Sequence, residues 1–173
     1  MCQQVMIAMA LANDPDLLIA DEPTTSLDVI VQAQILDLLR SIRKERELTI
    51  VLISHDLGVV TGLADRVCVL YAGRIVEQGD VDDIYHRSRH PYTRGLLAAV
   101  PRPTGAKHRR LTSFEGAAPS LLRVPTGCAF QPRCPRRAAD CLEADPRLRP
   151  VGSVQVACHH AEDLDVSCAS DRS

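Results

Sequence analysis

Two adjacent carboxylates stand where a short apolar run of the sequence ends. Leu17 to Ala20 is wholly apolar, and Asp21 and Glu22 follow it directly. A second run, Thr49 to Ile53, is followed after one serine by His55. Carboxylates at such positions can hold Mg²⁺ through water or orient a water for attack on a phosphate, and a histidine can donate a hydrogen bond to that phosphate. These residue types therefore suit hydrolysis of a nucleotide.

Both runs have the length and composition of strands. A short apolar run is typical of a strand buried on both faces of a parallel sheet, and the second run is rich in β-branched residues. Between them, apolar residues at helical spacing predict an amphipathic helix: Val31, Ile35, Leu38, Leu39 and Ile42. Strand, helix and strand form a right-handed βαβ crossover, in which ligands bind at the carboxyl ends of the strands. We therefore expect Asp21, Glu22 and His55 to converge.

The same residues have an ordinary structural interpretation. Acidic residues are common in loops at strand ends, and His55 could cap the helix that follows it. Asp21 and Glu22 taken alone favour this interpretation, because two acids do not define a site. The interpretation as a nucleotide site depends on the whole constellation of acids, histidine and strands.

Other segments show simpler patterns. An apolar helix is predicted over Val5 to Leu11, and it ends before a proline. Val67 to Tyr71 and Arg74 to Gln78 flank an Ala-Gly dipeptide, which indicates a hairpin with a tight turn. Short helices are expected over residues 81–86 and 91–99.

Composition and charge bound the function. The 173 residues are 46% hydrophobic, which is ample for a globular core. Residues 1–100 hold 9 Lys and Arg against 14 Asp and Glu, whereas residues 101–173 hold 11 against 8. Aromatic residues are not interleaved with the basic segment, so a solvated surface is favoured and no nucleic-acid partner is expected. No apolar run is long enough to span a bilayer and no basic leader precedes one, so we expect a cytosolic compartment.

The sequence changes character after Pro101. Residues 101–150 contain eight of the eleven prolines and show no clear helical or strand period, which indicates a domain boundary. Four cysteines follow, separated by five, six and sixteen residues: Cys128, Cys134, Cys141 and Cys158. Four thiolates can hold tetrahedral Zn²⁺ or an iron–sulfur cluster. The tight Cys-x-x-Cys knuckles of a zinc ribbon do not occur, and loose spacing suits a larger cluster, but spacing alone leaves zinc and metal-free thiols open.

Three further cysteines and two histidines need a separate account. Cys2, Cys68 and Cys168 belong to no such pattern, and Cys68 is expected to be a small core residue because it stands in an apolar strand. His159 and His160 adjoin Cys158 and could replace a ligand. We expect them instead to be exposed residues of the tail.

The motifs in combination resemble those of ABC-type ATPases. The segment LLIADEPTTSLD is similar to the Walker B segment and D-loop of that family, and LISHD is similar to its H-loop. The resemblance implies an α/β fold: the C-terminal part of a P-loop NTPase parallel sheet with helices, followed by a small, loop-rich cysteine extension. It implies ATP and Mg²⁺ as cofactors, with Asp21 on the Mg²⁺ side and Glu22 as the catalytic carboxylate. It also implies that Asp28 communicates across a dimer and that His55 contacts the γ-phosphate.

A narrower resemblance concerns His90 to Pro101, HPYTRGLLAAVP. This segment is similar to the one that follows the ATPase core in the ATP-binding subunits of bacterial oligopeptide and dipeptide importers. Their cysteine-bearing extension is associated with a [4Fe–4S] cluster, so the resemblance implies a cluster on the four cysteines, with Zn²⁺ as the alternative. It divides the chain into residues 1–100, a partial ABC ATPase domain, and residues 101–173, the extension.

The resemblance also implies a function and partners. The subunit hydrolyses ATP to energise peptide import, and lies peripherally on the cytoplasmic face of the cell membrane. Its partners are the permease subunits, a second ATP-binding subunit in a homodimer or heterodimer, and, indirectly, an extracytoplasmic solute-binding protein. Two other functions stay open: a non-catalytic iron–sulfur or zinc module with a vestigial ATPase half, and an ABC-type ATPase of DNA repair. The acidic ATPase part disfavours the second of these.

Several motifs of the resembled family do not occur in the 173 residues. There is no glycine-rich phosphate loop (Walker A) and no Q-loop, and Met1 aligns with the last residue of the signature motif. Gln4 stands where the family usually has arginine. We therefore expect Met1 to be an internal methionine of a longer protein, although a genuine half-domain is the alternative. We also expect the isolated chain to have negligible ATP affinity and to be inactive by itself.

Overall fold

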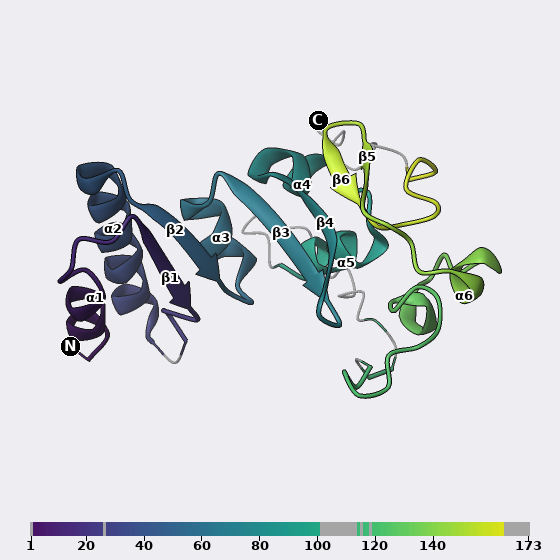
Figure 1. Cartoon of the computed structure of the whole chain (residues 1–173), viewed down its shortest axis with the longest axis horizontal. Helices are drawn as coiled ribbons and strands as arrows, with labels where there is room; N and C mark the ends of the chain where they lie inside the picture. Colours follow the sequence, from purple (N-terminus) through teal and green to yellow (C-terminus); the bar gives the residue numbers. More distant parts are fainter. Residues whose placement is uncertain (1, 26, 101–113, 115, 118, 165–173) are drawn as a thin grey trace, which may run out of the picture. The chain divides into compact units, whose positions relative to one another are not determined.

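The computed structural model describes residues 2–25, 27–100, 114, 116, 117 and 119–164 (Figure 1). The chain forms two compact units, Met1–Ala64 and Asp65–Ser173. The prediction for Cys168 lies outside the described residues. In the part of the chain that the structure describes, no helix is both long enough and apolar enough to cross a membrane.

The first unit contains the predicted βαβ crossover. Its elements, in chain order, are α1 (Cys2–Ala10), β1 (Leu17–Asp21), α2 (Val29–Arg46), β2 (Thr49–Ile53) and α3 (Leu57–Leu63). Strands β1 and β2 pair in parallel, so that Asp21 lies beside Ile53 at their carboxyl ends. The predicted strand, amphipathic helix and second strand are confirmed.

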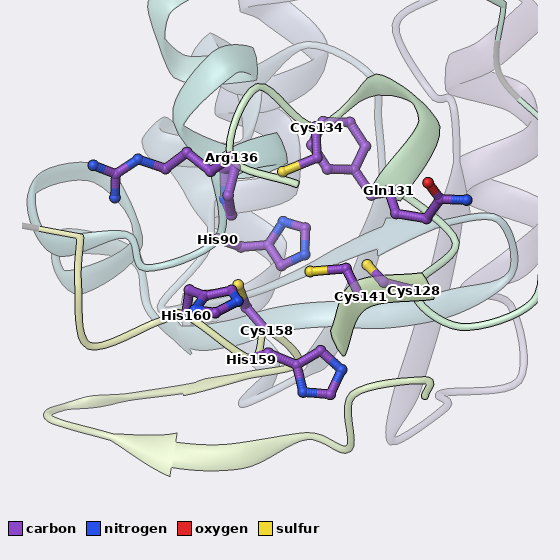
Figure 2. Close-up of a pocket in the computed structure, with 11 residues that line it drawn as sticks. His90, Cys128, Gln131, Cys134, Arg136, Cys141, Cys158, His159 and His160 are labelled. Carbon is purple, nitrogen blue, oxygen red and sulfur yellow. The ribbon is translucent and has the colours of Figure 1, made fainter. Parts of the chain in front are cut away.

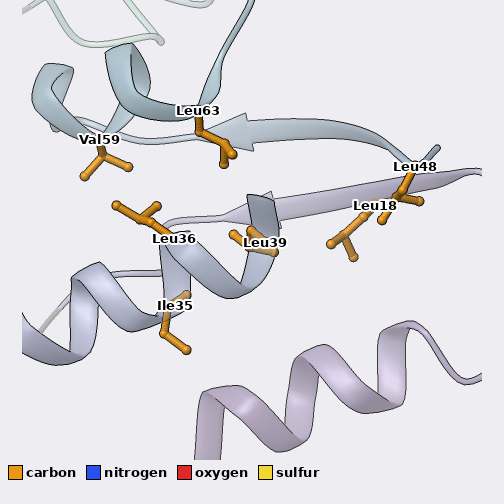
Figure 3. Close-up of a cluster of buried hydrophobic side chains, with 7 residues drawn as sticks. All are labelled: Leu18, Ile35, Leu36, Leu39, Leu48, Val59 and Leu63. Carbon is orange, nitrogen blue, oxygen red and sulfur yellow. The ribbon is translucent and has the colours of Figure 1, made fainter. Parts of the chain in front are cut away.

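The core of the first unit lies on one face of this sheet. Helices α2 and α3 supply most of its buried side chains, which are Leu18, Ile35, Leu36, Leu39, Leu48, Val59 and Leu63 (Figure 3). Each fully buried Leu or Ile side chain contributes about 1.5–3 kcal/mol relative to an exposed one. The apolar face of α2 therefore fixes the position of both strands and of the residues that follow them.

The prediction that both strands are buried on two faces is wrong. Leu18 is 8% exposed, whereas Ile19 is 62% exposed and Val51 is 45% exposed. Successive side chains of a strand point to opposite faces, and the helices cover only one of them among the described residues. Strands β1 and β2, although apolar on both faces, therefore each have one exposed face in this unit.

The second unit is built on an antiparallel sheet in the order β3-β4-β6-β5. Its elements, in chain order, are β3 (Arg66–Tyr71), β4 (Arg74–Asp80), α4 (Val81–Arg87), α5 (Pro91–Ala99), the 3₁₀ turn η1 (Gln131–Arg133), α6 (Asp140–Glu143), β5 (Arg149–Val151) and β6 (Val154–Val156). The predicted hairpin and both helices are confirmed. Ala72 and Gly73 both have positive φ, 49° and 76°, as a tight hairpin turn requires.

Strands β5 and β6 were not predicted. Each has three residues and one contains a proline, so neither is long enough for an alternating pattern to be recognised. They attach to the predicted hairpin because Glu77 pairs with Val156, and Gln78 with Gln155. This pairing places the chain that carries Cys158 beside β4.

The inner side of β3 meets a cluster of aromatic rings. Tyr71, Tyr92, Phe114 and Phe130 have ring centroids 4.7–5.8 Å apart, and Phe130 is almost fully buried. Cys68 points the other way, is exposed, and donates its thiol hydrogen to Gln78 Oε1 at 3.5 Å. The expectation that Cys68 is a core residue is wrong, because strand alternation puts its neighbours inside.

Candidate functional site

The carboxyl ends of β1 and β2 bring Glu22 and His55 into contact. Nδ1 of His55 lies 2.8 Å from Oε1 of Glu22, and the Thr25 hydroxyl donates a hydrogen bond of 2.6 Å to Oε2. Glu22 also extends the pairing of the strands, because its N–H donates to the carbonyl of Ile53 at 2.9 Å. Its φ of 49° is in the left-handed region, which costs a residue with a side chain about 1–3 kcal/mol. The carboxylate is therefore held between Thr25 and His55 by a strained backbone.

Glu22 and His55 each stabilise the charged form of the other. The hydrogen bond from Thr25, and then the one from His55, lower the pKa of Glu22. The hydrogen bond with Glu22 and its negative charge raise the pKa of His55. Both side chains are open to solvent, with 37% of the Glu22 side chain and 75% of the His55 side chain exposed. The arrangement favours an ionised carboxylate beside a histidine that protonates more readily than usual.

The other predicted residues of this region lie nearby in the same unit. Asp21 is the last residue of β1 and is exposed. Asp28 is the N-cap of α2 and accepts hydrogen bonds from the backbone N–H groups of Ile30 and Val31 at 3.0 and 2.9 Å. The alternative interpretation, in which His55 caps the following helix, is wrong, because Asp56 is the N-cap of α3. The imidazole of His55 is thus turned to Glu22 instead.

A second candidate site lies in the second unit, where the four cysteines line one pocket (Figure 2). Cys128 precedes η1, Cys134 follows it, Cys141 belongs to α6 and Cys158 follows β6. The N–H of Cys128 donates to the carbonyl of Cys141 at 2.9 Å, which joins two of the four segments. We call this arrangement the four-thiol pocket.

Burial shapes the chemistry of these thiols. It raises the pKa of Cys128 and Cys134, and it raises that of Cys158 to about 11. Repulsion from neighbouring thiolates adds to this effect. Without a cation, the raised pKa values of Cys128, Cys134 and Cys158 favour their protonated thiols. A bound metal would reverse the preference, because its positive charge stabilises the thiolates and displaces their protons.

The distances between potential ligand atoms limit which metal the pocket can hold as it lies. Among the described residues, the ligand atoms of Asp140, Cys141 and His160 all lie within 4.8 Å of one another. No three of the four described thiols are as close together. Four zinc–sulfur bonds of about 2.3 Å in a tetrahedron place the sulfur atoms roughly 3.8 Å apart. In this structure the four thiols are therefore not closed around a single zinc ion.

His159 and His160 are not exposed tail residues, which corrects the sequence-based expectation. Both are half-buried and line the four-thiol pocket. The Nε2 atom of His159 lies 2.9 Å from the carbonyl oxygen of Ala144, just after α6. His160 bonds Asp140, at the start of α6. The two histidines therefore connect the segment after β6 to the segment that carries Cys141.

His90 and Glu77 were not recognised as site residues from sequence. His90 is 1% exposed and lines the four-thiol pocket, and burial lowers its pKa to about 4. Its Nδ1 accepts the N–H of Tyr92 at 3.1 Å, so it is the N-cap of α5. Glu77 is fully buried in β4 and accepts the backbone N–H of Arg89. The sequence signal was the proline after His90, since proline favours the first turn of a helix.

Comparison with known proteins gives consistent matches. Residues 76–141 match the family described as "Oligopeptide/dipeptide transporter, C-terminal region". The chain is 51% identical over 170 residues to the oligopeptide transport ATP-binding protein OppD of Mycobacterium tuberculosis, covering 98% of this chain and 28% of OppD. It is 48% identical over 159 residues to the dipeptide transport ATP-binding protein DppD of Haemophilus influenzae, covering 92% of this chain and 48% of DppD. A solved dimeric ATP-binding cassette in a post-hydrolysis state, bound to ADP and Pi, matches 46% of this chain and 34% of that chain, with 34% identity and a TM-score of 0.42.

The βαβ crossover with an acid and a histidine at its carboxyl edge, together with the similarity to OppD and DppD, agrees with the fold of the C-terminal part of an ABC-type ATPase domain. This fold class is the one that the sequence motifs predicted. Over most of its own length the chain is similar to oligopeptide and dipeptide transport ATP-binding proteins. It spans under half the length of the two relatives described above.

Proposed function

We propose that this chain provides the hydrolytic residues of an ATPase subunit that energises peptide import. The carrying observation is the 2.8 Å contact between Glu22 and His55 at the carboxyl edge of β1 and β2. Both relatives described above are peptide transport ATP-binding proteins, which supports peptides as the transported class. In this proposal residues 1–100 belong to the ATPase domain and residues 101–173 to the extension.

Each residue of this site has a distinct proposed role. Glu22 orients the attacking water and accepts its proton, which is the work of a general base. Because Nδ1 of His55 is bonded to Glu22, its Nε2 is the atom that contacts the γ-phosphate, and the raised pKa favours the proton that this contact needs. Asp21 would hold Mg²⁺ through water; when bound, this ion neutralises phosphate charge. Asp28 fixes the start of α2 and would reach the second subunit of a dimer.

The proposed partners follow from the same function. A second ATP-binding subunit would complete the nucleotide site, and permease subunits would receive the work of hydrolysis. An extracytoplasmic solute-binding protein would act through the permease. We place the subunit peripherally on the cytoplasmic face of the membrane.

ATP hydrolysis by a chimera tests the role of Glu22. The segment of Mycobacterium tuberculosis OppD that precedes the matched region is fused to this chain, because the chain has no phosphate loop of its own. Glu22→Gln should lower the rate by about 10²–10⁴-fold, as expected for loss of a general base. Asp37→Asn, an exposed change on α2, is the control and should leave the rate unchanged. An active chimera that Glu22→Gln does not slow would show that the ATPase half is vestigial.

We further propose that the four-thiol pocket holds a [4Fe–4S] cluster, with Zn²⁺ as the alternative. Support comes from the shared pocket of the four cysteines, no three of which lie as close together as the sulfur ligands of one zinc ion would. Bound there, the cluster would add a redox centre and cross-link segments of the extension. Anaerobically purified protein should contain about four irons per chain and be brown. A colourless protein with one zinc per chain would contradict the cluster, and Cys141→Ser should reduce the metal content in either case.

A further inference from the structure

His90 is a buried histidine against the four-thiol pocket, and its hydrogen bonds decide what it can do there (Figure 2). A buried imidazole beside thiols can bind the metal or position the residues that bind it. The first role needs a ring nitrogen with a free lone pair. The second needs both nitrogens to be bonded to the surrounding protein.

Both nitrogens of His90 are engaged. Nδ1 accepts the N–H of Tyr92, so it carries no hydrogen, and the hydrogen of the neutral ring is therefore on Nε2. The ring also forms a hydrogen bond with the backbone of Ala157. Because Nε2–H can only donate, its partner is the carbonyl oxygen of Ala157. No lone pair of His90 is left for a metal.

The bonded residue directly precedes Cys158. The N–H of Ala157 donates to the carbonyl of Val76 in β4 at 2.8 Å, so the sheet holds this residue from one side and His90 holds it from the other. The loop before His90 is itself fixed, because the carboxylate of Glu77 accepts the N–H of Arg89. A continuous set of hydrogen bonds thus runs from β4 to the peptide that leads into Cys158.

We propose that His90 is a positioning residue of the four-thiol pocket: its imidazole fixes the peptide between Ala157 and Cys158 and holds the Cys158 sulfur toward the other three thiols. This inference rests on the proposed metal-binding function of the pocket. This role would make the segment His90 to Pro101 important for the extension as well as for the start of α5. Outer residues that orient metal ligands typically change metal affinity by about 10–100-fold.

The first test compares His90→Ser with the wild-type chain. Serine is a good N-cap and preserves the start of α5, but its side chain is too short to reach Ala157. The rate at which a chromogenic chelator removes the metal should rise about 10–100-fold in His90→Ser. His86→Ser replaces an exposed histidine of α4 and should match the wild type. An unchanged rate of metal release in His90→Ser would overturn the proposal.

A second readout works without metal and separates this inference from the cluster proposal. In the metal-free chain, iodoacetamide alkylation followed by mass spectrometry measures the accessibility of each thiol. Iodoacetamide should alkylate Cys158 at least about tenfold faster in His90→Ser than in the wild type, because the variant releases the segment after β6. The alkylation rate of Cys128 should change much less. If the wild type binds no metal, the cluster proposal fails, while the alkylation result still decides the role of His90. Equal alkylation of Cys158 in both proteins would refute it.

His90→Asn keeps the inference testable if serine disturbs folding. Asparagine retains an acceptor for Tyr92 and carries an amide donor, so it should show release and alkylation rates between those of the wild type and His90→Ser. If His90→Asn has an unchanged melting temperature but loses metal as fast as His90→Ser, the hydrogen bonds of His90 are not what slows metal release.

Discussion

Nε2 of His160 lies 3.0 Å from Oδ1 of Asp140, which joins the segment after β6 to the first residue of α6. Cys158 stands two residues before this histidine, and Cys141 follows this aspartate directly. The hydrogen bond between Cys128 and Cys141 adds a third segment to the same group. Three of the four cysteines are therefore tied together by contacts that need no metal.

A double-mutant cycle should detect this link. Asp140→Asn, His160→Gln and the double variant are compared by urea unfolding of the metal-free chain. Because both side chains are partly open to solvent, the coupling energy should be small and favourable. Strictly additive single changes would show that the contact contributes nothing to stability.

Sequence patterns predicted α1, β1, α2 and β2 of the first unit because each leaves a strong local signal. The apolar run at Leu17 and the 3.6-residue period of α2 each depend on residues close together in the chain. The same signals could not show which face of a strand is covered, since that depends on elements elsewhere. Ile19 is exposed for this reason, although it stands in an apolar run.

The second unit was less predictable because its site depends on distant pairs. The four cysteines could be grouped by type, and the structure gathers them in one pocket. The partners of His159 and His160 lie 15 and 20 residues earlier in the chain, and no local pattern marks such pairs. His90 was hidden in a different way, because its sequence context reports a helix start and not the pocket beside it.

The pair of Glu22 and His55 should give a defined pH dependence. Glu22 has a lowered pKa, so its contribution to stability is full above its ordinary value of 4.5 and is lost as the pH falls through its folded-state pKa. His55 has a raised pKa, so its contribution is full below 6.5 and is lost as the pH rises through its folded-state pKa. The pair is therefore most favourable between pH 4.5 and 6.5.

NMR titration of the His55 imidazole measures this effect directly. Its pKa should lie above 6.5 in the wild type and fall in Glu22→Gln, because that change removes the charge and weakens the hydrogen bond that raise it. Asp37→Asn, whose carboxylate pairs with Arg40 on α2, should leave the titration as it is. A His55 pKa that is the same with and without the Glu22 charge would contradict the contact.

Glu77 should destabilise the chain increasingly as the pH rises. Burial raises its pKa, so the folded state holds its proton more strongly than the unfolded state does. The contribution of Glu77 to folding stability is therefore most favourable below its ordinary pKa of 4.5 and is lost as the pH rises through its folded-state pKa. In urea unfolding, Glu77→Gln should gain stability relative to the wild type between pH 4.5 and 7.

Glu77→Ala provides the comparison for this prediction. It removes the acceptor of the Arg89 N–H as well as the charge, so it should cost about 1–3 kcal/mol for the buried donor left without a partner. A glutamine variant that is destabilised as much as the alanine variant at pH 7 would show that the charge of Glu77, and not an oxygen acceptor, holds this loop.

Two glycines of the extension both have a positive φ, but only one of them is crowded by neighbouring atoms. Comparing substitutions at the two sites distinguishes the cost of backbone strain from the cost of crowding. Gly127 has a φ of 71°, and a Cβ there would lie 2.4 Å from the carbonyl oxygen of Cys141, the atom that accepts the N–H of Cys128. Gly152 has a φ of 61°, but no atom lies within 4 Å of the corresponding position. Alanine at either site incurs about 1–2 kcal/mol of left-handed backbone strain.

Gly127→Ala should therefore cost clearly more than Gly152→Ala, because it also forces the segments of Cys128 and Cys141 apart. We expect a loss above about 3 kcal/mol for Gly127→Ala, made up of this strain plus overpacking, together with a reduced metal content. Gly152→Ala should keep its metal, since its turn between β5 and β6 has room for a methyl group. Equal stability losses and equal metal contents would mean that the close approach of these two cysteine segments is not required for the four-thiol pocket.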